Sequence, residues 1–195
     1  MFDPVHRGHI AAAEAAKAAW RLDEVWMMIT ARPPHKRPVT PLRHRLAMLR
    51  LALKGRRGFK ISLMEAKRPG YHYAVDTLRR LGRKHLLVDW IYLMGGDAAL
   101  GFKTWKSWKA FHRLCTLGVV SRPGFSVKKV RAMFKQCGFQ EGREYVCLNA
   151  VTPDVSSTTI RKKGSDLPRS RGAFFFLDRR VADYIKRHRL YEKKT

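Results

Sequence analysis

The sequence predicts an α/β protein in which helices cover both faces of a doubly wound, mostly parallel sheet. Helical and strand-forming stretches alternate along the chain, which is the pattern of βαβ units. The strand stretches are short and apolar, as expected of buried parallel strands. With 195 residues, 45% of them hydrophobic, the chain can form one domain with a substantial core. We therefore predict a single domain over residues 1–195.

The expected elements follow from periodicity, helix propensity and turn residues. The Ala-rich stretch 9–22 favours a helix because Ala is the strongest helix former. A second helix should begin with Thr40 as its cap and Pro41 in its first turn. In chain order we expect a helix at 9–22, a strand at 24–30, a helix from Thr40 and Pro41, a strand at 59–65, a helix at 74–84, a strand at 89–96, a helix at 103–114, a strand at 115–121, a helix at 127–137, a strand at 144–150, and helices at 156–163 and 178–191.

The composition limits the classes of partner and the compartment. Lys and Arg number 41 against 15 Asp and Glu, a formal net charge of +26. This excess favours a polyanion, whether nucleic acid, an acidic membrane surface or a phosphorylated small molecule. Three cysteines without CxxC spacing, Cys115, Cys137 and Cys147, predict buried thiols in a reducing compartment. No apolar run reaches the roughly 20 residues that span a bilayer, so we expect a cytoplasmic protein without a membrane partner.

The stretch DPVHRGH, residues 3–9, is the first candidate site. His6 and His9 are three residues apart where a helix is expected to begin, and Gly8 allows a close approach of the backbone. Both imidazoles and the free amides of the first turn can then converge on one anion. The alternative is a capped helix start with two solvated histidines.

Three further candidate sites follow predicted strands, where ligands bind in open α/β sheets. In ARPPHKRP, residues 31–38, two prolines stiffen a loop that presents His35 and Lys36. In VSSTTIRKK, residues 155–163, Ser157 and Thr158 lie at a helix start and Arg161 one turn on, a phosphate-binding pattern. In GGDAALGFKTWKSW, residues 95–108, Asp97 can accept from ribose hydroxyls and Trp105 can stack on a ring. A solvated basic loop, a plain N-cap and a core Trp are the respective alternatives.

Seven motifs stand in this order: FDPVHRGH, PPHK, YHYAVDTL, GGDAALGFKTW, VVSRPG, SSTTIR and VADYIKRHRLY. Together they resemble those of bacterial nicotinate-nucleotide adenylyltransferases, in the HxGH nucleotidylyltransferase superfamily, which has a Rossmann-like sheet. The likeness runs from residue 2 to residue 191. It implies transfer of AMP from ATP to nicotinate mononucleotide, giving deamido-NAD and pyrophosphate, with Mg²⁺ on the triphosphate. The sequence has no HExxH or other metal-ligand spacing, so a metal should arrive with the nucleotide.

The resemblance also implies roles for individual residues. His6 and His9 would contact the ATP phosphates, Asp97 the ribose, and Ala74 and Trp105 the nicotinate ring, Ala74 through its main-chain amide. The expected catalytic residues are His6, His9, Lys36 and Arg161. The expected ATP contacts are His6, Gly8, His9, Asp97, Ser157, Thr158 and Arg161, and those of nicotinate mononucleotide are His35, Ala74, Thr77, Trp105 and Arg122.

The sequence departs from the family pattern in three places. Met1 stands where the family usually has Ser or Thr, and a preceding hydrophobic strand and Gly-Gly pair are absent. Because that strand is central, we expect a truncated chain whose neighbouring strands have unpaired backbone groups. Lys106 stands where relatives often have an aromatic residue, and Ala74 replaces a frequent Thr.

Three alternative functions remain open. A phosphopantetheine adenylyltransferase is disfavoured by His6, PPHK and the Trp105 stretch. Nicotinamide mononucleotide differs from the acid by few atoms and is harder to exclude as a substrate. A nucleic-acid-binding protein would explain the charge, but the basic residues are spread along the chain and no helix-turn-helix, RRM or zinc-finger pattern is present.

Overall fold

The strands form two parallel sheets. A computed structural model of the chain describes residues 1–34, 38–121, 125–150, 152–162 and 175–192. Strand β1 (Val25–Met28) pairs with β2 (Phe59–Ser62), with Val25 opposite Phe59. The second sheet has the order β3 (Ile91–Gly95), β4 (Thr116–Ser121), β5 (Tyr145–Asn149), with Ile91 opposite Thr116 and Leu117 opposite Tyr145. All these pairs are parallel, as the sequence predicts.

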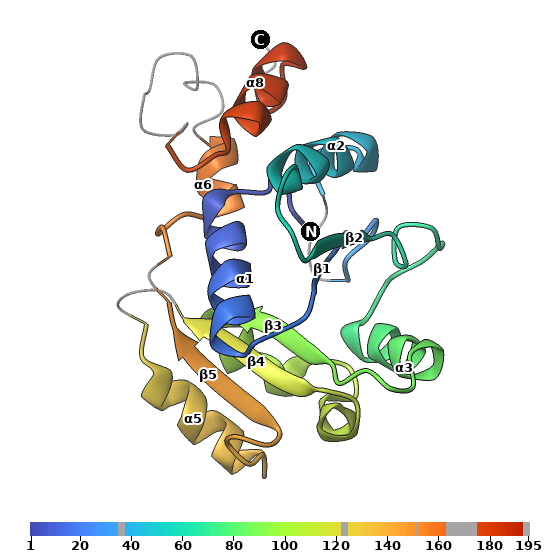
Figure 1. Cartoon of the computed structure of the whole chain (residues 1–195), viewed down its shortest axis with the longest axis vertical. Helices are drawn as coiled ribbons and strands as arrows, with labels where there is room; N and C mark the ends of the chain where they lie inside the picture. The colour runs from blue at the N-terminus through green and yellow to red at the C-terminus, as the bar shows by residue number, and fades with distance from the viewer. Residues whose placement is uncertain (35–37, 122–124, 151, 163–174, 193–195) are drawn as a thin grey trace.

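Helices follow each strand and cover the sheets (Figure 1). Among the described residues, the helices longer than one turn are α1 (Arg7–Ala19), α2 (Leu42–Leu53), α3 (Ala74–Lys84), α4 (Gly96–Leu100), α5 (Val127–Gln136), α6 (Ser157–Lys162) and α8 (Arg179–Arg187), together with the 3₁₀ helix η2 (Trp108–Arg113). A shorter 3₁₀ turn, η1, spans Phe102–Thr104. The alternation of helix and strand is therefore that of an α/β fold.

The three-stranded sheet is covered on both faces because its side chains alternate. Leu117 and Val119 of β4 pack with Val130 and Phe134 of α5, together with residues of α3 and η2. On the opposite face, Val120 packs against Ala16 of α1. The sheet is thus doubly covered, as expected of buried parallel strands.

A second core joins β1 to the helices near the two chain ends. Ile10 of α1, Met48 and Leu49 of α2, Ile160 of α6 and Ile185 of α8 belong to one buried cluster. Helix α8 lies beside α2, and α6 lies at the N-terminal end of α1 (Figure 1). The last part of the chain is thereby packed around the first.

Arg45 of α2 is fully buried and holds several loops. Its guanidinium donates to the carbonyl oxygens of Thr30 at 2.7 Å, Thr40 at 3.0 Å and Met1 at 3.2 Å. Burial lowers the pKa of Arg45 from its usual value. The guanidinium is still charged, because an Arg side chain is not deprotonated in proteins. These hydrogen bonds connect α2 to Met1, to Thr30 after β1 and to Thr40 before the helix.

Several expected boundaries are wrong. The helix expected at 103–114 is two 3₁₀ segments, because Trp105 is extended and Ser107 has φ +49°. Gly96, expected in a strand, begins α4. At α2 the N-cap is Pro41 and makes no side-chain cap bond. The backbone amide of Thr40 instead donates to Asp3. Helix α1 ends at Ala19, before Arg21 with φ +49°.

Candidate active site

The two histidines of the first motif form the start of α1. His6 is the N-cap, and its Nδ1 accepts the backbone N–H of His9 at 3.3 Å. The Nδ1 of His9 accepts the backbone N–H of His6 at 3.3 Å, so the two residues make a reciprocal capping box. Their rings stack with centroids 3.7 Å apart. Both imidazoles therefore lie together, as the spacing predicts.

This capping fixes the tautomer of both rings. A nitrogen that accepts from a backbone N–H carries no proton, so the neutral rings hold their proton on Nε2. Burial, followed by the charge of His6, sets the pKa of His9 well below its usual value. His9 is thus a neutral Nε2–H donor at neutral pH, which is a form that can donate to a phosphate oxygen.

Gly8 lies against both the histidine pair and the chain before α6. A Cβ there would lie 3.1 Å from Nδ1 of His6 and 3.2 Å from Cγ1 of Val155. The Nε of Arg7 donates to the carbonyl oxygen of Leu177, shortly before α8, at 3.1 Å. Close packing, and not only backbone freedom, explains the glycine.

Helix α6 docks on the turn that precedes His6. Ser157 Oγ donates to the carbonyl of Pro4 at 2.9 Å, and Arg161 Nη1 donates to the carbonyl of Asp3 at 2.7 Å. Arg161 Nη2 also donates to Thr158 Oγ1 at 3.2 Å. Residues more than 150 positions apart therefore meet, and the predicted triphosphate residues lie next to the histidine turn.

Asp3 organises this site, although sequence reasoning assigned it no individual role. Its buried carboxylate accepts from the backbone amide of Val39 at 2.8 Å and from the hydroxyl of Tyr191 at 2.8 Å. It thereby joins the first turn to the segment before α2 and to the residues after α8. The only sequence signal for it is its place inside the FDPVHRGH motif.

A second group of predicted residues surrounds the start of α3. Ala74 is the first residue of this helix, where the geometry leaves the amide without an acceptor inside the helix. Lys106 Nζ pairs with Asp76 at 2.9 Å and lies 4.6 Å from the ring centre of Tyr73. The neighbouring residue, Trp105, is half-buried and packs edge-on to Tyr92, with ring centroids 5.7 Å apart. Ala74 and Trp105 are thus linked through Lys106 and Asp76.

Thr77 faces the interior. Its hydroxyl donates to Glu65 Oε1 at 2.8 Å, and the other oxygen of this buried carboxylate accepts from the hydroxyl of Thr30. Glu65 thus ties α3 to the ends of β1 and β2. The Thr77 hydroxyl holds this network together, which is a structural role that the sequence does not reveal.

The remaining predicted residues lie at β3 or outside the described part. Asp97 is exposed in the first turn of α4, directly after β3, where the carboxyl ends of the strands lie. His35, Lys36 and Arg122 fall outside the residues that the structure describes. Asp97 therefore occupies the strand end expected for a ligand contact.

The cysteines are half-buried, whereas the sequence predicts buried thiols. Burial raises the pKa of Cys115 to about 12 and that of Cys147 to about 11. Both thiols are therefore protonated and weakly nucleophilic at neutral pH. Within the described ranges, no group of three or more His, Cys, Asp or Glu side chains could hold a metal ion, and no helix could span a membrane.

Comparison with known proteins identifies the family. Residues 1–163 match the cytidylyltransferase-like family. A probable nicotinate-nucleotide adenylyltransferase of Thermomicrobium roseum is 36% identical over 97% of this chain and 87% of that protein. One from a strain of Thermus thermophilus is 35% identical over 97% of this chain and 95% of that protein.

Solved structures agree on the fold. The Plasmodium falciparum nicotinic acid mononucleotide adenylyltransferase complexed with NaAD has a TM-score of 0.79 at 18% identity, covering 97% of this chain and 93% of that one. The same enzyme complexed with APC has a TM-score of 0.77 at 17% identity, covering 97% and 92%. By sequence and by fold, the chain belongs to the cytidylyltransferase-like family and, within it, to the nicotinate-nucleotide adenylyltransferases.

Proposed function

We propose that this chain transfers the adenylyl group of ATP to nicotinate mononucleotide, forming deamido-NAD and pyrophosphate. The observation that carries the proposal is the docking of α6 on the histidine turn, with Ser157 on Pro4 and Arg161 on Asp3. This docking gathers two imidazoles, hydroxyl groups and a guanidinium around the start of α1. Such donors suit a triphosphate.

The reaction needs alignment and charge neutralisation more than a base. An oxygen of the 5′-phosphate of nicotinate mononucleotide attacks the α-phosphorus of ATP. The bond from that phosphorus to the α,β-bridging oxygen breaks, and pyrophosphate leaves with the electron pair. The nucleophile is already an anion, so no proton has to be removed. His6, His9 and Arg161 would donate to the charge that develops on the phosphate oxygens.

Mg²⁺ is proposed to enter as part of the substrate, bound to the triphosphate. It would neutralise charge on the phosphate oxygens and order the chain of phosphates. Lys36, which the sequence places in a segment with two prolines, would add positive charge beside them. The use of ATP favours the cytoplasm as the compartment, where free thiols persist.

Nicotinate mononucleotide is proposed to bind at the start of α3. The amide of Ala74 would donate to the nicotinate carboxylate, and Trp105 would stack on the ring. The N-terminal end of a helix favours a negative group, and Lys106 lies in the same place. Asp97 would bind the ribose of ATP, and His35 and Arg122 would contact nicotinate mononucleotide.

An assay of adenylyl transfer with the purified full chain tests the proposal. ATP and Mg²⁺ are supplied with nicotinate mononucleotide, nicotinamide mononucleotide or phosphopantetheine, and pyrophosphate release is measured. We expect kcat/KM to be highest for nicotinate mononucleotide. Arg161→Gln should reduce turnover strongly, while Arg57→Gln, an exposed arginine on another part of the surface, should not. Preference for either other acceptor, or equal activity of both variants, would refute it.

A further inference from the structure

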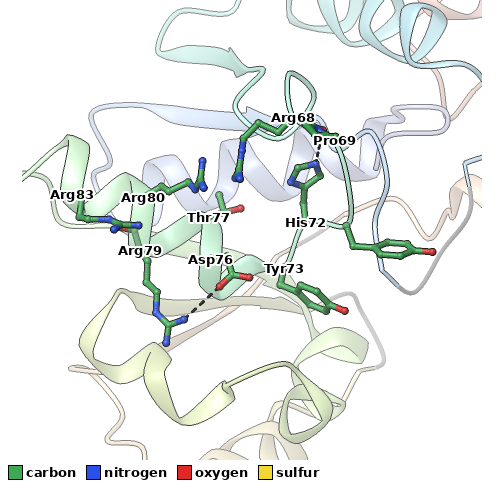
Figure 2. Close-up of a pocket in the computed structure, with 10 residues that line it drawn as sticks. Arg68, Pro69, His72, Tyr73, Asp76, Thr77, Arg79, Arg80 and Arg83 are labelled. Carbon is green, nitrogen blue, oxygen red and sulfur yellow. Dashed lines mark hydrogen bonds and ion pairs between the residues drawn. The ribbon is translucent and has the colours of Figure 1, made fainter.

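A cationic hollow lies beside α3, apart from the histidine turn. It has a volume of about 290 Å³, and its lining includes Arg68, Arg79, Arg80 and Arg83 (Figure 2). A neighbouring hollow of about 340 Å³ shares Arg80 and Arg83 and adds Lys84. The two hollows therefore adjoin, and five cationic side chains line them.

These charges are poorly compensated within the described part of the protein. Asp76 is the one carboxylate among the described lining residues, and it pairs with Arg79 at 3.4 Å and with Lys106 at 2.9 Å. Among the residues that the structure describes, none accepts a hydrogen bond or forms an ion pair with the guanidinium of Arg68 or Arg80. Like charges that line one hollow repel, so an anion between them would stabilise the arrangement.

The loop that carries Arg68 is held in place. The ring Nε2 of buried His72 lies 3.1 Å from the carbonyl oxygen of Arg68 and donates to it, since a carbonyl can only accept. The backbone amide of His72 donates to the carbonyl of Arg32 at 3.4 Å. Figure 2 shows the Arg68 and Arg80 side chains pointing toward one another, with Asp76 and Tyr73 on the other side of the helix. The arginines are thus presented by an anchored loop and a helix.

We propose that these hollows form a second anion site, which binds a chain of phosphate groups. Arg80 and Arg83 are one helical turn apart, about 5 Å along the axis, and Arg68 faces Arg80 from the loop. A single phosphate would engage only some of these side chains, whereas successive phosphates can each meet a guanidinium, the side chain best suited to bind them in pairs of hydrogen bonds. The arginines of this anion site are not among the residues proposed for adenylyl transfer, although the lining also includes Thr77, which the resemblance gives as a contact of nicotinate mononucleotide and whose hydroxyl donates to Glu65 instead.

Two sources supply such a chain: a free oligophosphate and the backbone of a nucleic acid strand. Chemical modification of arginine distinguishes them residue by residue. The full chain is treated with phenylglyoxal, and modified arginines are mapped by mass spectrometry. Parallel samples contain tripolyphosphate, a single-stranded oligonucleotide, orthophosphate or poly-glutamate.

We expect tripolyphosphate or the oligonucleotide to slow modification of Arg68 and Arg80 roughly tenfold, while exposed Arg57 is unaffected. Protection by tripolyphosphate identifies the free source, and protection by the oligonucleotide alone identifies the strand. Protection at Arg161 only, equal protection at Arg57, or equal protection by poly-glutamate or orthophosphate would overturn the proposal.

Paired variants test the same site by affinity. Arg68→Gln with Arg80→Gln should weaken binding of the protecting ligand, measured by calorimetry, about tenfold or more, and one class of binding site should disappear. Arg50→Gln with Arg57→Gln removes the same charge from exposed positions elsewhere and should leave affinity within about twofold. An equal loss of affinity in both double variants would mean that net charge alone explains the effect, and it would overturn the proposal of a specific site. Adenylyl transfer is also measured on the wild type and on all variants. A failure of the proposed reaction is thereby distinguished from a failure of the proposed anion site.

Discussion

His9 has a structural role in capping α1, and in the proposed reaction the same ring would have a chemical role. Its Nδ1 accepts from the backbone of His6, and this bond leaves Nε2–H as the donor of the ring. The donor would be fixed before substrate binds, so little reorganisation is needed during the reaction. The structure thus explains why a histidine, with two ring nitrogens, suits this position.

The first prediction concerns catalysis by this ring. His9→Ala should lower kcat roughly 100-fold or more, the cost of one preorganised donor to developing charge, and change KM for either substrate much less. Steady-state kinetics with both substrates varied measures this. His9→Asn keeps an acceptor near the position of Nδ1 but lacks Nε2, so it should lose kcat as well. An unchanged kcat in either variant would remove His9 from the reaction.

The second prediction concerns pH. The folded-state pKa of His9 is lowered, so below about pH 6.5, the pKa of an unfolded His, the unfolded chain binds a proton that the folded chain does not. Folding stability should therefore fall as the pH falls through this range, and be unaffected by this group above it. Comparing Tm at pH 7.5 and 5.5, we expect a larger drop for the wild type than for His9→Asn. Identical drops would mean that His9 titrates normally.

The third prediction concerns substrate choice at Lys106. Its charge lies at the start of α3, over the ring of Tyr73. Lys106→Met should lower kcat/KM for nicotinate mononucleotide several-fold, because the attraction to its carboxylate is lost, and leave the amide substrate nearly unchanged. Lys109, which lies 5.7 Å from the ring centre of Trp108, provides the control as Lys109→Met. Equal losses for both substrates would assign Lys106 a structural role.

At the scale of elements, Gly118 allows α1 to approach β4. A Cβ at this position would lie 2.6 Å from Cζ3 of Trp20 and 2.7 Å from Cγ2 of Ile91. Trp20 closes α1 as its C-cap, so the strand and the helix end need a residue without a side chain between them. The glycine therefore sets how closely α1 covers the three-stranded sheet.

The fourth prediction follows from this contact. Gly118→Ala should lower the free energy of unfolding by about 1–3 kcal/mol, a usual cost of overpacking a core. Gly82→Ala in α3 meets no atom within 4 Å and should be neutral or slightly stabilising, because Ala favours helix. Urea denaturation of both variants measures the difference. If the Gly118→Ala variant were as stable as the wild type, Trp20 would be able to move aside without a loss in the free energy of unfolding.

Local sequence signals predict elements well where propensity and packing agree. Helix α3 spans Ala74–Lys84, as expected from its apolar spacing. The single helix expected at 103–114 is wrong because the aromatic side chains of this segment pack into the core around Phe102 and Phe111, which overrides helix propensity. Glu65 and Arg45 could not be predicted as organisers, because most of their hydrogen-bond partners lie 12 to 44 positions away in the sequence.

In the candidate site, too, local sequence signals predict some features, whereas others depend on contacts between distant segments. His6, Gly8 and His9 could be predicted as one group, since their spacing fixes their geometry on a helix start. The hydrogen bond between Arg161 and Asp3 joins residues 158 positions apart. Only the ordered motifs of the family suggested that these two segments lie together. The position of Asp97 at the end of β3 followed from the general rule for parallel sheets.

At the scale of the whole molecule, segments far apart in the sequence support one another. The Tyr191 hydroxyl donates to Asp3 at 2.8 Å, and Leu177, Val181 and Ile185 share the core of α1 and α2. The histidine turn is therefore stabilised by the last described segment of the chain. The sheet next to it, β1 with β2, packs in the same core.

The fifth prediction tests this support. Tyr191→Phe removes one hydrogen bond to a buried carboxylate and should lower the free energy of unfolding by about 1–3 kcal/mol. It should also raise KM for ATP several-fold, because Asp3 positions the turn that we propose holds the phosphates. Denaturation and steady-state kinetics measure the two effects. Tyr184→Phe, whose hydroxyl lies 2.9 Å from His44 instead, should leave KM unchanged. Equal effects on KM would contradict a specific role for the Asp3 contact.

The hydrogen bond between Tyr191 and Asp3 also bears on when this protein becomes functional. During synthesis Asp3 leaves the ribosome long before Tyr191, which lies 188 positions further along the chain. A nascent chain whose Tyr191 is still inside the exit tunnel lacks the bond, however well its first helices have formed. The turn that we propose binds phosphate is thereby completed by a residue that emerges late, so its maturation is coupled to the progress of translation.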